Sequence, residues 1–164
     1  MLSATLTYER QSHSLIKELL CQKQTTVKAY VVSDSMSPFI KARDIIVIRP
    51  VTPKELRLGD IVVFDKEGRL FSHRLIRKYF KANRHIFITK SDRTFVADMP
   101  FTDKKLMGKV SRVQKSVKTL NLESIFWTLI NRFLGLYHLT MFSVRNRLRP
   151  LKSYLFKKTS RCRL

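Results

Sequence analysis

Glycine and cysteine are both scarce in this chain of 164 residues, which has four glycines and two cysteines. Cys21 and Cys162 lie near opposite ends, and neither belongs to a CxxC or Cys/His spacing. This placement excludes a metal knuckle and argues against a structural disulfide. We therefore expect neither a metal nor another cofactor.

The N-terminus lacks a long apolar run, because polar and charged residues interrupt the first twenty positions. A secretory signal peptide needs an unbroken apolar segment there. We expect neither such a peptide nor an N-terminal transmembrane anchor in this sequence.

Acidic residues are few: 12 stand against 33 basic ones, so the formal net charge is +21. This excess favours an anionic partner, which could be nucleic acid or a phospholipid surface. Residues 145–164 hold eight basic residues and no acid, so part of the charge forms a tail. No helix-turn-helix, RNP or zinc-finger signature is present, so we expect no specific nucleic-acid partner.

The pattern of apolar residues divides the chain into three predicted regions. Residues 1–26 should form an N-terminal helix, with its apolar face at Leu15, Ile16, Leu19 and Leu20. Residues 27–118 should form a β-domain, and residues 119–164 a helix with the basic tail.

Short β-rich runs separated by turn signals define the middle region and predict a mainly β fold. The runs are VKAYVV, DIIVIRP, GDIVVF, RLFSHRLI, HIFITK and GKVSRVQKSV, and DKEG at 65–68 predicts a hairpin turn. We expect a coiled antiparallel sheet or partial barrel.

The segment VVSDSMSPFI at 31–40 places three serines, a methionine and a proline directly after a strand. Ser, Asp and Pro favour turns, so the segment could be only a turn. One of its serines could instead be a nucleophile, which would need a neighbouring base and a group that orients this base.

Two histidines of the β-region could supply the base. His85 lies among basic residues in KANRHIFITK and is interpreted as a surface residue, whereas His73 lies inside the alternating strand RLFSHRLI. A single histidine on a strand is more often structural. Asp92 and Asp98, in TKSDRTFVADMP, could orient a histidine, form Asx turns or act as counter-ions.

Five motifs occur in a familiar order: SDSMSP, GDIVVF, SHRLI, TKSD with a second Asp six residues later, and GKV. In this order they resemble the signal peptidase I family, of the S24/S26 type. The similarity is closest to the Ser-His branch from archaea and the eukaryotic secretory membrane, and it covers about residues 30–115. It implies a signal-peptidase/LexA-like fold and a serine endopeptidase that removes a signal or leader peptide from a precursor.

The resemblance also implies a role for each matching residue. Ser35 would be the nucleophile and His73 the general base. Asp98 would hold the imidazole, and Asp92 would shape the loop. Ser33 would bind the oxyanion beside the Ser35 amide, a donor that typically contributes on the order of 10²–10³ in kcat.

Other positions match the motif or depart from it. Met36 and Pro38 complete the serine motif and are expected to contribute to substrate binding, with the methionine packed beneath the turn. Asp34, Arg43 and Ser91 stand where relatives usually have glycine, which brings the geometry of these turns into question.

Two other functions compete with the peptidase. A self-cleaving repressor of the LexA-like group needs an Ala-Gly or Cys-Gly bond before the serine, but all four glycines lie after it. Such repressors also use lysine as the base. A non-catalytic basic module that binds a membrane or nucleic acid remains the alternative.

Residues 125–144 form the one long apolar stretch, interrupted by a polar stripe at Thr128, Asn131, Arg132, Gly135 and His138. An arginine near the centre of a membrane span costs roughly 2.5–3.5 kcal/mol. We therefore expect a helix that lies in the membrane interface, with Trp127 and Tyr137 at headgroup level. Spanning the bilayer and packing on the protein's own sheet are the alternatives.

Together these observations predict a membrane-associated protein, peripheral or anchored through its C-terminal segment. Its expected partners are a peptide or preprotein substrate and an anionic membrane surface, with a membrane-anchored protein as a possible third.

Overall fold

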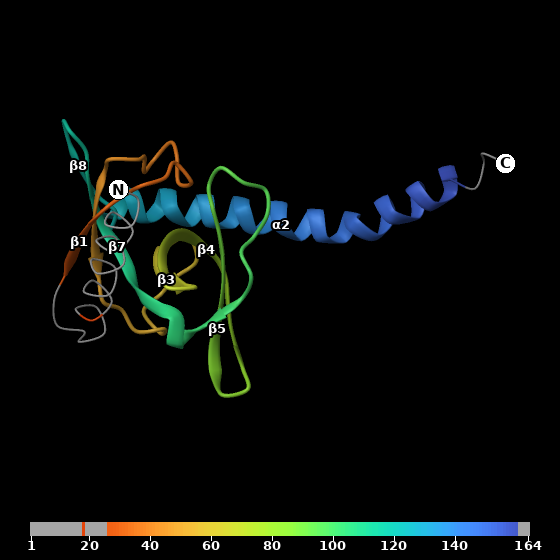
Figure 1. The fold of residues 1–164 in the computed structure, drawn as a ribbon, viewed down its shortest axis with the longest axis horizontal. Coiled ribbons are helices and arrows are strands. Elements are labelled where there is room, and N and C mark those ends of the chain that lie inside the picture. The colour runs from red at the N-terminus through yellow and green to blue at the C-terminus, as the bar shows by residue number, and fades with distance from the viewer. Residues whose placement is uncertain (1–17, 19–25, 161–164) are drawn as a thin grey trace, which may run out of the picture.

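The structure is a computed structural model that describes Glu18 and residues 26–160. A curled antiparallel sheet is followed by a long helix, as Figure 1 shows. The elements are β1 (Val27–Tyr30), β2 (Ile45–Arg49), β3 (Ile61–Lys66), β4 (Arg69–Lys81), β5 (Arg84–Lys90), β6 (Phe101–Thr102), the 3-10 helix η1 (Asp103–Lys105), β7 (Leu106–Gln114), β8 (Thr119–Asn121) and α2 (Ile125–Ser160). The predicted mainly β fold is confirmed.

The strands follow the order β1-β2-β7-β3-β4-β5-β6, and β8 pairs with β7. Each of the six predicted runs forms a strand, whereas the short β6 and β8 were not predicted. The predicted hairpin joins β3 to β4 through Glu67 and Gly68, which both have positive φ. A two-residue turn of this kind matches the right-handed twist of its strands.

Strand β3 lies in the middle of the sheet, and both of its faces are buried. Ile61 and Val63 belong to one apolar cluster, while Val62 and Phe64 belong to a second. Burial on both faces explains why this strand reads as a continuous apolar run instead of an alternating one.

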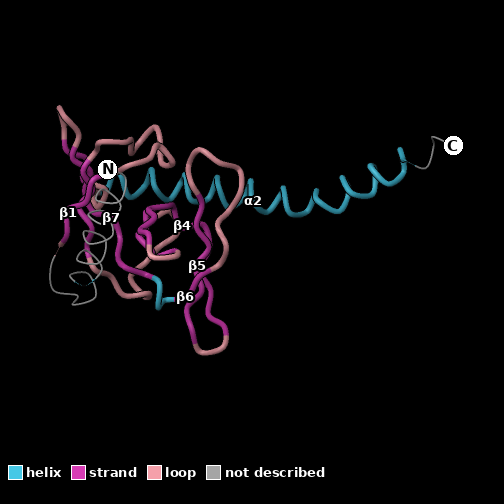
Figure 2. The backbone as a smooth tube through the Cα atoms, in the orientation of Figure 1, coloured by secondary structure: helices cyan, strands magenta, loops and turns pink. Residues whose placement is uncertain are grey.

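Helix α2 runs beside the curled sheet, and its C-terminal half extends away from it (Figures 1 and 2). The two make contact where the helix crosses the turn before β3. A Cβ atom on Gly135 would lie 2.6 Å from the backbone nitrogen of Gly59, and a Cβ on Gly59 would overlap the backbone of Asn131. Small residues at both positions therefore allow this close approach.

The expected orientation of α2 is wrong for most of the polar stripe and for Trp127, whose ring packs against Phe39 and the core cluster instead of lying at headgroup level. Three members of its polar stripe, Asn131, Gly135 and His138, are buried against the protein's own sheet instead of facing headgroups or water. The Asn131 and His138 side chains have partners on β4, β5 and the loop after β5, which is why their burial is tolerated.

Among the residues that the structure describes, no helix has both the length and the sustained apolar character needed to cross a bilayer. Of the predicted N-terminal helix, residues 1–26, the structure describes only Glu18, which is helical, and Thr26, which is not. Both cysteines lie outside the described residues.

Candidate active site

The serine motif forms the turn that follows β1. Backbone hydrogen bonds between Val31 and the pair Arg43 and Asp44 close this turn at its base. Met36 is 1% exposed and packs in the core, as expected, while Ser35 is half-buried above it. Met36 therefore has almost no surface to offer a substrate, so its expected contribution to substrate binding is limited to supporting the turn from below.

The residues that replace the usual glycines are accommodated in different ways. The Asp34 carboxylate accepts a hydrogen bond of 2.9 Å from the Ala42 amide, so its charge has a local partner. Arg43 adopts φ 72°, the left-handed region that favours glycine. The Ser91 hydroxyl donates to the Ser35 carbonyl, a contact that glycine could not make.

The Ser35 residue is held from two sides. Its hydroxyl accepts a hydrogen bond of 3.3 Å from the Ser33 hydroxyl. Its carbonyl accepts hydrogen bonds from Ser91 and from the Arg93 amide, the latter at 3.2 Å. The loop after β5 therefore contacts the serine motif directly. Pro38, in the same motif, is exposed.

His73 lies on β4 opposite Val62 and is 8% exposed. Its ring packs against Phe64 and Phe71, with centroids 6.0 and 6.1 Å away. Its Nδ1 lies 2.7 Å from Asp98 Oδ2, so the predicted contact between these two residues is present. A carboxylate at this distance fixes the proton on Nδ1 and leaves Nε2 able to accept another.

Asp98 is held by a further hydrogen bond that the sequence did not reveal. The Thr89 hydroxyl donates to Oδ2 at 2.6 Å, and the Asp98 amide donates to the Thr89 carbonyl at 2.8 Å. Burial alone would raise the pKa of Asp98, but the hydrogen bonds from His73 and Thr89 outweigh it and hold this pKa below its ordinary value. The carboxylate is therefore ionised at neutral pH.

Within residues 26–160 no hydrogen bond joins Ser35 to His73. Both residues are nevertheless held by the segment 89–98: Ser35 by its residues 91 and 93, and His73 by Asp98.

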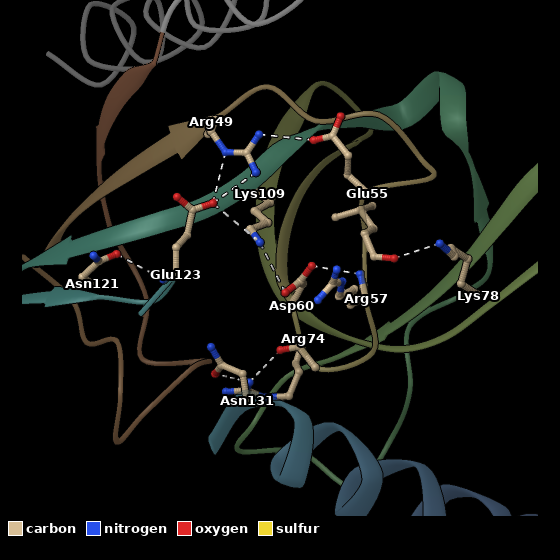
Figure 3. Close-up of polar contacts among 12 residues, drawn as sticks. Arg49, Glu55, Arg57, Asp60, Arg74, Lys78, Lys109, Asn121, Glu123 and Asn131 are labelled. Carbon is tan, nitrogen blue, oxygen red and sulfur yellow. Dashed lines mark hydrogen bonds and ion pairs between the residues drawn. The ribbon is translucent and has the colours of Figure 1, made fainter. Parts of the chain in front are cut away.

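Asp92 has a different set of partners. It forms a two-point ion pair with Arg74, at 2.9 Å to Nε and 2.8 Å to Nη2. The Nη1 of Arg74 donates to the Gly59 carbonyl and to Asn131 of α2, each at 2.8 Å. The last of these contacts appears in Figure 3. Arg74 is fully buried, and four of its five N–H groups have acceptors.

A second histidine completes this buried cluster. His138 of α2 places Nε2 3.2 Å from Asp92 Oδ1, and its Nδ1 lies 3.0 Å from Lys90 Nζ. Burial, and then the Lys90 charge, lower the pKa of His138. Burial also lowers the pKa of Lys90. His138 is therefore neutral at pH 7, accepting from Lys90 and donating to Asp92.

We name this group the clamp: Arg74, Lys90, Asp92, Asn131 and His138. It joins β4, β5 and the loop after β5 to helix α2. No group of His, Cys, Asp or Glu in the described part of the chain is arranged to hold a metal ion.

Comparison with known proteins agrees with the motifs and the fold. The family model described as Peptidase S24-like matches residues 3–111. The chain belongs to the Peptidase S24-like family. Two relatives are signal peptidase complex catalytic subunits SEC11, from Scheffersomyces stipitis and Lodderomyces elongisporus. Each is 32% identical over 77 residues, which are 46% of this chain and 46% of the relative.

The chain thus spans about half the length of the curated relatives it matches. Membership of the Peptidase S24-like family and the similarity to SEC11 support a peptidase of the signal-peptidase type.

Three polar residues of this Peptidase S24-like chain were missed by sequence reasoning: Thr89, Arg74 and Lys90. All three are buried in strands, where a polar side chain needs a partner. A polar residue inside a predicted strand was the sign that the sequence offered for each of them, and it did not identify their partners.

Proposed function

We propose that this protein is a serine endopeptidase that cleaves a signal or leader peptide from a precursor. Ser35 is the nucleophile and His73 the general base. The observation that carries the proposal is the 2.7 Å contact between His73 Nδ1 and Asp98 Oδ2 in a chain with the SDSMSP motif. Asp98 thereby keeps Nε2 free to take the serine proton.

The proposed reaction uses the chain's own groups throughout. As Ser35 Oγ attacks the scissile carbonyl, its proton moves to His73 Nε2. The tetrahedral intermediate then collapses, the C–N bond breaks, and His73 gives the proton to the leaving amine. Water, activated by His73, hydrolyses the acyl-serine and releases Ser35.

The oxyanion would be stabilised by the Ser35 amide and the Ser33 hydroxyl. The Ser33 hydroxyl already donates toward Ser35 Oγ at 3.3 Å, so a small rotation would redirect it to an oxygen bonded to the attacked carbon. We assign Asp92 to the clamp, in which it orders the loop that contacts Ser35. Met36 supports the turn, and Pro38 lies on the exposed side toward substrate.

We infer that the substrate binds in extended form. Among residues 26–160, strand β1 pairs only with β2, so no other described strand lies along its second edge, where an extended peptide could add as a further strand. Tyr30 and Val32 are 75% and 87% exposed at the end of this strand, directly before the serine motif. Two large exposed apolar side chains at the end of this edge strand suit an extended apolar peptide.

The relatives' name, signal peptidase complex catalytic subunit, motivates a preprotein substrate and a membrane location for this chain. We propose that the protein acts at a membrane surface, with a membrane-anchored partner as an optional component. The division into residues 1–26, 27–118 and 119–164 remains a prediction.

The test incubates the purified full-length protein with detergent-solubilised precursors that carry intact leader peptides. New N-termini are labelled and identified by mass spectrometry. Ser35→Ala should abolish cleavage, whereas Ser37→Ala, a matched change in the same turn, should retain it. Equal cleavage by Ser35→Ala and wild type would refute the nucleophile, and no cleavage by wild type would favour the non-catalytic basic module.

A further inference from the structure

Helix α2 has two opposite faces of different chemistry. Asn131, Gly135 and His138 lie buried toward the sheet. Eight large apolar side chains, each 42% to 83% exposed, form what we name the outer stripe: Ile125, Phe126, Leu129, Phe133, Leu136, Tyr137, Met141 and Val144. At about 100° per residue, these eight positions fall on one continuous side of the helix.

The clamp keeps the outer stripe turned away from the sheet. Rotating α2 to bury the stripe would remove Asn131 from Arg74 and His138 from Asp92. It would also break the close approach of Gly135 to Gly59. A buried ion pair that loses partners is strongly destabilised, so the helix has one favoured orientation.

The charges around the outer stripe suggest what binds it. Arg132, Arg145 and Arg147 are exposed on the same helix, and residues 145–164 hold eight basic residues and no acid. An apolar helix face with flanking cations suits an anionic bilayer, because its side chains enter the acyl region while the cations meet headgroups. Exposed apolar surface of this extent is uncommon on a soluble monomer.

We propose that the outer stripe of α2 binds the surface of an anionic lipid bilayer, while the clamp holds the β-domain on the other side of the helix. This deepens the membrane association proposed above by naming the surface and the lipid class. Lipid binding of this kind needs no catalysis, so it can be tested apart from peptidase activity.

The position of the outer stripe relates the bilayer to the candidate active site. Tyr137 and Met141 of the stripe line a cavity of about 340 Å³ together with Arg93 and Phe95. Arg93 donates its amide to the Ser35 carbonyl. A bilayer on the outer stripe would therefore lie beside the loop that supports Ser35, a suitable place for a membrane-bound precursor.

The experiment uses full-length Ser35→Ala protein, so no proteolysis can occur during binding. Sedimentation measures binding to vesicles of neutral phosphatidylcholine and to vesicles that also contain phosphatidylglycerol. The stripe variant Leu129→Ser/Phe133→Ser/Leu136→Ser is compared with a matched variant, Phe80→Ser/Met99→Ser/Val117→Ser, whose positions are exposed on the β-domain.

We expect the stripe variant to lose about 100-fold or more in partitioning to both kinds of vesicle, because three large apolar side chains no longer enter the lipid. The matched variant should bind like the parent. Added salt should weaken binding to the anionic vesicles and leave binding to neutral ones almost unchanged. Circular dichroism checks that both variants retain their helix content.

Absence of vesicle binding by the parent protein, or equal binding by the stripe variant, would overturn the proposal. So would self-association that depends on the stripe without lipid binding, because the occupant would then be a second copy of the chain. Cleavage assays on wild type are run separately, so a failed peptidase proposal leaves this result interpretable.

Discussion

Residues 26–160 contain two histidine–aspartate pairs, each with a buried histidine, that look alike in isolation and differ in their surroundings. His73 contacts Asp98 at 2.7 Å, and the third member of that group is the neutral hydroxyl of Thr89. His138 contacts Asp92 at 3.2 Å, but Asp92 also neutralises Arg74, and Lys90 contacts the other ring nitrogen.

This difference in surroundings separates the proposed roles of the two pairs. Asp98 accepts hydrogen bonds from the His73 ring and the Thr89 hydroxyl and pairs with no other charge among these contacts, so its charge can stabilise a proton gained by His73. His138 faces Asp92, Lys90 and Arg74, so an added proton would meet two cations and one anion. A histidine–aspartate contact therefore indicates a base only when the remaining neighbours leave room for a positive charge.

The largest expected effect is a loss of activity that occurs on changing His73 and not on changing His138. His73→Ala should lower kcat/KM by about 10³-fold or more, because Ser35 would lose its base. His138→Gln, which retains a donor toward Asp92, should leave kcat/KM close to wild type. Steady-state cleavage of a soluble peptide measures both, and comparable losses in the two variants would contradict the distinction.

The next largest expected effect is a difference in activity between variants of the two aspartates. Asp98→Asn should lower kcat by about 10²–10⁴-fold with little change in KM, since an amide can stabilise the wrong imidazole tautomer. Thr89→Val removes only the second partner of the same carboxylate and should cost far less. Small and equal losses for Asp98→Asn and Asp92→Asn would mean that both residues only shape the loop.

For stability the order should be the opposite of that for activity, so that changing Asp92 costs more than changing Asp98. Asp92→Asn leaves Arg74 buried without its counter-ion, so the free energy of unfolding should fall by about 3–5 kcal/mol. Denaturant unfolding followed by circular dichroism measures this loss. The double variant Arg74→Met/Asp92→Leu should be less destabilised than Asp92→Asn, because no unpaired charge remains. A larger loss in the double variant would contradict the clamp.

The smallest expected effect concerns pH. The pKa of His138 is lowered in the folded protein, so the unfolded chain takes up this proton first as pH falls below about 6.5. Stability should therefore decrease below that pH, and His138→Gln should remove this part of the decrease. The pKa of Asp98 is also lowered in the folded protein, so this residue should reduce stability only as pH falls below about 4.

Thermal unfolding between pH 4.5 and 8 checks this prediction. The charged groups that face the His138 ring are Lys90, Asp92 and Arg74. An unchanged pH dependence in His138→Gln would show that another group is responsible.

Local features of the fold were predictable from sequence because they depend on neighbouring residues. The alternating and continuous apolar runs identified the six long strands, and DKEG identified the β3–β4 turn. The contact between Asp98 and His73 was predicted from resemblance, because motif order carries information about distances that spacing alone does not. The catalytic roles themselves stay predictions.

Only the tertiary structure decided the partners of Asp92 and the orientation of α2. Sequence composition determined that residues 125–144 are amphipathic, and that their cations favour an anionic surface. It could not determine which face would turn inward, since Arg74, Asp92 and Asn131 come from three distant segments. Burying Arg74 requires partners for its charge and its N–H groups, and the polar face of α2 supplies them, so the apolar face is the one left outside.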